Sequence, residues 1–205
     1  MLCRAKAPSI LRKLFPSLIW NIATNEKKVW LTFDDGPHPK TSPFILDILK
    51  EYNIKATFFC VGKNIEKNPE IFERIKTDGH SIGNHSYSHL NGFTTSRNRY
   101  LQDVEKCQKL MPNTKLFRPP FGKIYSWQMT KLKCKYKIIM WDVMAWDFDN
   151  NISPERCLKN VTDNVKEGSV IVFHDNEKSF KNLQYALVKT INHLKEKGFI
   201  FSATW

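Results

Sequence analysis

The sequence predicts a single α/β domain built on a mostly parallel sheet or a barrel. Short apolar runs alternate with segments whose apolar residues recur at a helical period, which is typical of parallel strands joined by helices. Several of the apolar runs end directly in charged or imidazole side chains, so potential functional groups lie where strands end. The 205 residues contain no repeat, linker or low-complexity tract, and one domain accounts for them.

The first half of the chain alternates three expected strands with three expected helices. The strands are short apolar runs, and the helices carry apolar residues three and four positions apart. In chain order these elements are strand 29–33, helix 42–52, strand 56–61, helix 65–76, strand 81–82 and helix 95–111. Gly79 follows the second helix and Pro112 follows the third, and both residue types favour the end of a helix.

The second half continues the same alternation. Dense apolar strands are expected at 136–141 and 169–173, a last strand at 199–203, and helices at 154–166 and 183–196. Because parallel strands present their carboxyl ends at one edge of a sheet, the polar residues that follow them are expected to meet there.

The composition fits a globular protein with a strongly basic surface. Hydrophobic residues make up 41% of the chain, and the formal net charge is +12. The lysines are spread along the chain, which favours a solvated surface, with attraction to lipid headgroups, nucleic acid or an acidic cell-wall polymer as the alternative. No basic stripe is interleaved with aromatic residues, so we expect no nucleic-acid partner.

The cysteines and the first residues bear on location. Five cysteines share no metal-ligand spacing: Cys3, Cys60, Cys107, Cys134 and Cys157. They are expected to be reduced core residues, which suits a reducing compartment. Arg12, Lys13 and Pro16 interrupt the N-terminal apolar runs before a signal-peptide core forms, and no apolar stretch is long enough to span a bilayer.

Residues 1–27 are expected to form an arm that packs on a catalytic domain of residues 28–205. The alternative is an amphipathic patch, apolar with basic flanks, that touches a membrane surface peripherally. The apolar residues of this patch are Leu11, Leu14, Leu18, Ile19 and Trp20. We expect the protein to be a monomer.

Two polar clusters predict a metal site. Asp34 and Asp35 follow the first expected strand, and Gly36-Pro37 turns the chain there. Alone, such a run is common turn chemistry. His85 and His89 are spaced so that both imidazoles can face one point. One carboxylate plus two imidazoles would hold a divalent metal with coordination positions left open, so the clusters together predict a metal-dependent hydrolase.

Four motifs, taken in order, carry a resemblance to a known family. The runs TFDDGP at 32–37, HSYSH at 85–89, RPPFG at 118–122 and FHD at 173–175 resemble those of polysaccharide deacetylases of the NodB-like (carbohydrate esterase 4) family. The resemblance extends from about Val29 to the C-terminus. It implies a deformed (β/α) barrel of the NodB-homology type that removes acetyl groups from N-acetylated sugars, usually N-acetylglucosamine in a polymer.

The resemblance assigns the metal ligands and the base. Asp35, His85 and His89 resemble the family's metal ligands, while Asp34 resembles its catalytic base. A carboxylate bound to a metal loses basicity, so its neighbour is the better base. Arg118 resembles the residue that orients this base, because a guanidinium holds a carboxylate ionised in one geometry.

The remaining catalytic groups follow from the same resemblance. The backbone N–H of Phe121 resembles the donor to the developing oxyanion. His174 resembles the general acid that protonates the departing sugar amine. The expected substrate contacts are Pro120, Trp141 and Phe173, with Trp146 and Phe148 as further walls of the pocket. Core packing is the alternative for each of these aromatic residues.

One motif departs from the family pattern. Relatives place an aspartate that tethers the acidic histidine where this chain has Met144. Asp142 would share a face with Met144 on an extended strand and is therefore counted among the catalytic candidates. We expect Asp142 or Asp147 to hold His174, or the tether to be absent.

The sequence thus predicts a metal-dependent hydrolase that removes N-acetyl groups from amino sugars and releases acetate. The expected metal is zinc, with cobalt, nickel or manganese as alternatives, and the expected partner is an N-acetylated oligo- or polysaccharide. Two alternatives stay open: a metal- and glycan-binding domain with impaired catalysis, and an amidohydrolase acting on another small amide. The absent signal peptide favours the cytoplasm and the substrate class favours the cell envelope, so the compartment stays open.

Overall fold

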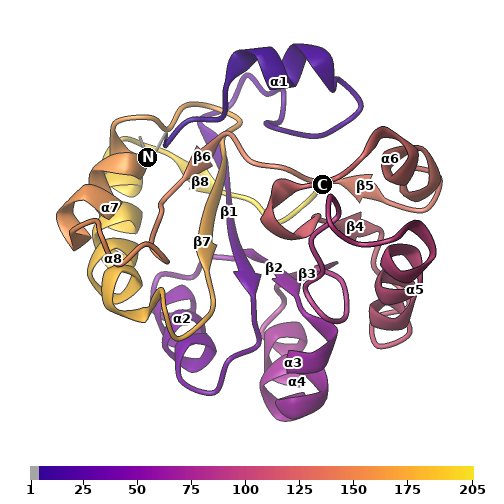
Figure 1. The fold of residues 1–205 in the computed structure, drawn as a ribbon. Coiled ribbons are helices and arrows are strands. Elements are labelled where there is room, and N and C mark those ends of the chain that lie inside the picture. Colours follow the sequence, from indigo (N-terminus) through magenta and orange to yellow (C-terminus); the bar gives the residue numbers. More distant parts are fainter. Residues whose placement is uncertain (1–4) are drawn as a thin grey trace.

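Parallel strands form the centre of the molecule in the order β5-β4-β3-β2-β1-β7-β6, with β8 paired to the start of β1. The computed structural model describes residues 5–205. The strands of this part are β1 (Lys28–Asp35), β2 (Thr57–Cys60), β3 (Ser81–Asn84), β4 (Leu116–Phe117), β5 (Lys137–Ile138), β6 (Val143–Met144), β7 (Val170–His174) and β8 (Ile200–Phe201). Helices surround the curled sheet (Figure 1), so the prediction of a parallel sheet in a deformed (β/α) barrel is confirmed.

The helices follow the predicted alternation with some differences. They are α1 (Ser9–Leu14), α2 (Thr41–Glu51), α3 (Gly62–Lys67), α4 (Pro69–Thr77), α5 (Arg97–Gln108), the 3₁₀ turn η1 (Pro120–Gly122), α6 (Ser126–Leu132), α7 (Pro154–Thr162) and α8 (Phe180–Glu196). The helix expected at 65–76 is the pair α3 and α4, because Pro69 lacks the N–H that a continuous helix needs and begins α4 instead. The sequence did not predict α1, α6 or the separate strand β6.

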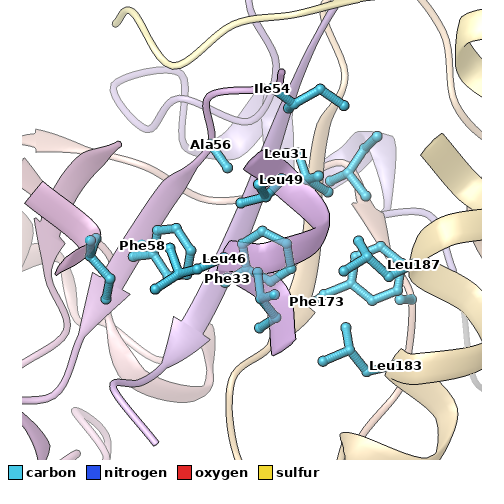
Figure 2. Close-up of a cluster of buried hydrophobic side chains, with 14 of the residues drawn as sticks. Leu31, Phe33, Leu46, Leu49, Ile54, Ala56, Phe58, Phe173, Leu183 and Leu187 are labelled. Atoms are coloured by element: carbon cyan, nitrogen blue, oxygen red, sulfur yellow. The ribbon is translucent and has the colours of Figure 1, made fainter. Parts of the chain in front are cut away.

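A hydrophobic core lies between the sheet and helices α2 and α8 (Figure 2). Phe33 of β1 stacks on Phe58 of β2 with ring centroids 5.1 Å apart, and Phe173 of β7 contacts Phe33 at 6.3 Å. Leu46 of α2 and Leu187 of α8 pack into the same cluster. Burial of such a side chain contributes about 1.5–3 kcal/mol. This packing anchors β1 and β7, the neighbouring strands whose ends carry the predicted catalytic carboxylates and imidazole.

The N-terminal segment bridges the two edge strands of the sheet. Lys6 pairs with Val143 of β6, and Ile19 pairs with Ile139, which directly follows β5. The carbonyl of Ile19 also accepts a hydrogen bond from the N–H of Met140 at 2.7 Å. Edge strands leave backbone groups unpaired, and this segment takes some of them. It therefore spans the opening between β5 and β6.

Helix α1 is the exposed part of this segment. Ile10 and Leu14 are 57% and 62% exposed, close in sequence to Arg12 and Lys13. The membrane contact predicted for the arm stays a prediction. Residues 1–4 of the arm, including Cys3, lie outside the described residues. No helix within residues 5–205 is long and apolar enough to cross a membrane.

The cysteines after residue 4 are all free thiols. Cys60, Cys107 and Cys157 are buried, as expected of core residues, and Cys134 is exposed. The expectation of a core position was therefore wrong for Cys134, which lies just beyond the last residue of α6 at the surface.

Candidate active site

The predicted site residues come from different strands and meet at one edge of the sheet. Asp34 and Asp35 end β1, His85 follows β3, Arg118 follows β4, and His174 ends β7. Each strand delivers its polar residue at its carboxyl end, where a parallel sheet gathers such groups from distant parts of the sequence. All of these residues except the buried Arg118 line one cavity of about 1090 Å³.

Asp35, His85 and His89 bring three metal-ligand atoms together. Asp35 Oδ1 lies 3.2 Å from His89 Nε2 and 3.6 Å from His85 Nε2. The Nδ1 of His85 is 2.8 Å from the carbonyl of Arg118, which can only accept, so Nδ1 carries the proton and Nε2 presents a lone pair. A carboxylate oxygen and an imidazole lone pair that face one another need a cation between them. The donor set therefore fits a divalent metal.

A second residue holds the Asp35 carboxylate in this orientation. The side-chain amide of Asn176 donates to Asp35 Oδ2 at 2.6 Å, which leaves Oδ1 for the imidazoles. Burial alone would raise the pKa of Asp35, but hydrogen bonds from His85 and His89 in their protonated forms outweigh burial and hold the pKa well below its usual range. Asp35 and His89 have φ of 81° and 55°, in the left-handed region that is unfavourable for residues with a side chain. Such strain is typical of functional sites held by their surroundings.

Arg118 is fully buried and fixes the Asp34 carboxylate. Its Nη1 donates to Asp34 Oδ1 at 2.6 Å and to Thr32 Oγ1 at 2.8 Å. The carbonyl of Ile139 accepts from Nε at 3.2 Å, and that of Met140 accepts from Nη2 at 2.8 Å. The guanidinium thus has one possible orientation. Oδ1 of Asp34 is occupied, while Oδ2 faces the metal-ligand cluster, 4.0 Å from His85 Nε2.

Asp147 is the residue that holds His174. Its Oδ1 is 2.8 Å from His174 Nδ1, and its Oδ2 accepts the backbone N–H of His174 at 2.7 Å. The ring of Phe148 packs edge-on against the imidazole with centroids 4.6 Å apart. Burial alone would lower the pKa of His174, but Asp147 outweighs burial and raises the pKa to about 9. The tether is therefore present, and Asp147 provides it in place of the residue expected at Met144.

The inclusion of Asp142 among the catalytic candidates was wrong. Its carboxylate accepts from Ser169 Oγ at 3.0 Å and from the backbone N–H of Val170 at 2.9 Å. Val170 begins β7 and His174 ends it. Four residues of strand separate these positions by about 13 Å. Asp142 therefore binds the beginning of β7, at the opposite end of the strand from His174.

Phe121, the expected oxyanion donor, lies beside the metal-ligand residue His89. It has φ of 60°, its side chain is 58% exposed, and its ring packs edge-on against His89 with centroids 4.5 Å apart. The neighbouring Gly122 N–H is bonded to the carbonyl of Pro119 at 3.0 Å. The N–H of Phe121, by contrast, has no acceptor within residues 5–205. It is available to a ligand.

Two of the predicted substrate contacts are wrong. Phe173 is completely buried in the core, because successive strand residues point to opposite faces and His174 takes the cavity side. Pro120 is buried in η1, and Pro119 lines the cavity instead. The third contact, Trp141, does line the cavity, as do Trp146 and Phe148.

The sequence did not single out Asn176, and it left the role of Asp175 open. The N–H of Asp175 donates to the carbonyl of Asp34 at 2.7 Å, and the carboxyl group of Asp175 accepts from the hydroxyl of Ser42. Burial raises the pKa of Asp175 to about 8. Asp175 thus ties the end of β1 to β7 and α2. The available signal was the position of both residues directly after His174.

Comparisons with known proteins agree with the geometry. Residues 21–137 match the sequence profile of the family described as polysaccharide deacetylase. A peptidoglycan-N-acetylglucosamine deacetylase of Bacillus cereus is 32% identical over 191 residues, which is 89% of this chain and 88% of that protein. A crystal structure of a peptidoglycan N-acetylglucosamine deacetylase has a TM-score of 0.88 and 34% identity, with 96% of this chain and 94% of that chain covered.

A further structural relative is described as a CE4 family pseudoenzyme. This protein, from Bacillus anthracis, has a TM-score of 0.81 and 27% identity, with 91% of this chain and 66% of that chain covered. The fold alone therefore does not decide whether a relative turns substrate over, and the side chains of the site must decide it.

Proposed function

This chain belongs to the polysaccharide deacetylase family, and from that premise we propose that it hydrolyses the N-acetyl group of N-acetylglucosamine units in a glycan and releases acetate. The observation that carries the proposal is a three-donor cluster flanked by two carboxylates, each already paired with a cationic side chain. Pairs of titratable groups whose surroundings push them toward opposite roles are typical of acid–base catalysis.

Asp35, His85 and His89 would hold a divalent cation. Such a cation, when bound, polarises the acetyl carbonyl and lowers the pKa of water. Two imidazoles with one carboxylate suit zinc, with cobalt, nickel or manganese as the alternatives. Metal dependence and the identity of the metal belong to this proposal.

Asp34 is the proposed base. Its free Oδ2 faces the cluster and would accept the proton of the water that attacks the acetyl carbon. Arg118 holds the carboxylate in one orientation, because a guanidinium cannot lose its proton in a protein and is here bonded on every side.

Phe121 and His174 complete the proposed reaction. As the C–O bond to water forms, negative charge develops on the acetyl oxygen, toward which the unpaired N–H of Phe121 would donate. His174, protonated because Asp147 raises its pKa, would transfer a proton to the amide nitrogen as the C–N bond breaks. The products are acetate and a sugar with a free amine.

Two alternatives to glycan deacetylation are impaired catalysis and hydrolysis of another small amide. Impaired catalysis was an alternative because the tether at Met144 is missing, and the contact of Asp147 with His174 removes that reason. A small amide would need far less room than the cavity of about 1090 Å³ provides, and sites for drug-sized ligands measure roughly 300–1,000 Å³. A glycan substrate is therefore the better fit.

The test is acetate release from N-acetylated glycans by protein that was first treated with a chelator and then reloaded with zinc or cobalt. We expect acetate to appear only after reloading. Asp34→Asn is the matched control, since it keeps the shape of the site and removes the base. Glycan binding without acetate release at any metal loading would contradict the proposal.

A further inference from the structure

Four exposed lysines line the active-site cavity without a carboxylate partner. Lys63 and Lys67 belong to α3, Lys123 follows η1, and Lys178 lies between β7 and α8. Lysine–carboxylate pairs in the described part of the chain involve other lysines: Lys28, Lys40, Lys76 and Lys135. These four exposed lysines, here called the lysine rim, come from three separate segments around one opening, and a fifth cavity lysine, Lys6, is half-buried.

The acidic groups of the cavity are already engaged. Asp34 is paired with Arg118 at 2.6 Å, and Asp35 belongs to the metal-ligand cluster. Glu177 lies 3.5 Å from Lys40 Nζ and 3.6 Å from His38 Nε2. The charge of the lysine rim is therefore not cancelled from within the cavity. A cleft lined by one sign of charge raises the local concentration of oppositely charged ligands.

The arrangement on α3 is unfavourable for the helix itself. Lys63 and Lys67 are four residues apart, so they are neighbours on one face of α3, and like charges at this spacing destabilise a helix. The cost is small. Glu66 lies three residues after Lys63, but its carboxylate accepts from the hydroxyl of Tyr87 at 2.6 Å and forms no ion pair with either lysine within residues 5–205. An anionic ligand in the cavity could therefore pair with both lysines.

We propose that the lysine rim selects a glycan strand that carries carboxylates. This inference rests on the proposed deacetylation, and it narrows the substrate from any N-acetylglucosamine polymer to an anionic one. A neutral chitin-type oligomer presents the same acetamide group to Asp34 and His174, but it carries no charge for the lysines to attract. Carboxylates near the acetamide would be attracted by the lysines directly.

The carboxylates of a peptidoglycan strand have two sources. One is the lactyl ether on the muramic acid ring, and the other is the peptide stem attached to that ether. Both present the same chemistry to a lysine. Strands with the stem removed by an amidase keep the lactyl carboxylate alone, so a comparison of stripped with intact strands identifies the source.

The experiment compares a rim variant with a charge-matched control. The rim variant carries Lys63→Gln, Lys67→Gln, Lys123→Gln and Lys178→Gln. The control removes four exposed lysines that do not line the cavity: Lys50, Lys109, Lys133 and Lys159. The readout is kcat/KM for acetate release from soluble peptidoglycan strands and from a chitooligosaccharide of equal length, at low and high salt.

We expect about a two- to threefold loss per lysine on the anionic strand, or on the order of thirtyfold for the rim variant. On the neutral oligomer the loss should stay below about twofold. The rate of the wild type on the anionic strand should fall with added salt, because ions screen exposed charges, and the rate of the rim variant should not. The control should match the wild type on the neutral oligomer and lose less than the rim variant on the anionic strand.

Equal losses on both substrates, or no loss on either, would overturn the proposal while leaving the deacetylation intact. If neither glycan released acetate, the proposed function would fail instead. The rim could then still be judged from binding, since the dissociation constant of the anionic strand should rise in the rim variant far more than that of the neutral oligomer. Equal changes in the two dissociation constants would refute the selection of anionic strands.

Discussion

Two buried carboxylates each pair with a cationic side chain at the active-site cavity, and the two pairs are held very differently. Asp34 and Arg118 are buried, with side chains 5% and 0% exposed, and the guanidinium is bonded to four different residues. Asp147 is buried as well, but its partner His174 is 13% exposed and lines the open cavity. In the first pair the cation is sealed in the interior and the carboxylate lines the cavity, whereas in the second pair the carboxylate is sealed and the cation lines the cavity.

The difference corresponds to the chemistry of the two cations. Arginine does not lose its proton in a protein, so Arg118 stays cationic and can only hold the Asp34 carboxylate in place. Histidine titrates, so Asp147 can set how firmly His174 holds its proton. The pair whose carboxylate faces the cavity suits a base, and the pair whose imidazole faces the cavity suits an acid that must give its proton to a substrate. Four substitutions test this contrast, from the largest expected effect to the smallest.

Arg118→Met should have the largest effect, because it leaves the buried Asp34 carboxylate without a cation. We expect a loss of about 3–5 kcal/mol in the free energy of unfolding. Acetate release should fall by more than about a hundredfold, since the proposed base loses its orientation. Urea unfolding and an acetate assay measure the two effects. The double variant Asp34→Asn, Arg118→Met should recover part of the stability and none of the activity. A wild-type urea midpoint in Arg118→Met would contradict the account.

Asp147→Asn should change the pH dependence of the reaction. The carboxylate raises the pKa of His174 to about 9, so its removal should lower that pKa. Because the acid acts only when protonated, activity is lost as pH rises through this pKa, and the basic limb of the kcat/KM profile should move to lower pH. At pH 8 the loss should be on the order of a hundredfold, and at pH 6 it should be smaller. An unmoved basic limb would remove Asp147 from the mechanism.

Asn176→Ala should weaken metal binding without unfolding the protein. The amide of Asn176 fixes one oxygen of Asp35, and loss of such a partner typically costs about ten- to a hundredfold in metal affinity. Competition with a chromogenic chelator measures that affinity, and excess metal should restore part of the acetate release. Asn164→Ala is the control, because its amide donates to the carbonyl of Asn160 in α7 and neither residue lines the cavity. Equal metal affinity in the two variants would contradict the role of Asn176.

Asp142→Asn should have the smallest effect on catalysis. Its carboxylate fastens Ser169 and Val170, so we expect a loss of about 1–3 kcal/mol in the free energy of unfolding. Both limbs of the pH profile should match the wild type. A shifted limb would return Asp142 to the mechanism and reopen the assignment of Asp147.

The predictions from sequence succeeded where the information is local. The polar residues at strand ends, the helical period of 42–52 and the spacing of His85 and His89 each depend on a few neighbouring residues. Predictions from local patterns were wrong where a strand is shorter than the prediction assumed. Asp142 would share a face with Met144 and stand near His174 only on a longer extended strand, but β6 comprises only Val143–Met144, and Trp146 has φ of 61°. The turn there carries Asp147 to His174.

The sequence by itself determined which chemical groups follow which strands, because strand ends and turns depend on short runs of neighbouring residues. Only the tertiary structure decided which carboxylate holds His174, that Phe173 belongs to the core, and that Asn176 reaches Asp35. Each of these depends on contacts within about 3–4 Å between segments far apart in the chain. Such distances are set by the packing and register of neighbouring strands, which no single segment encodes.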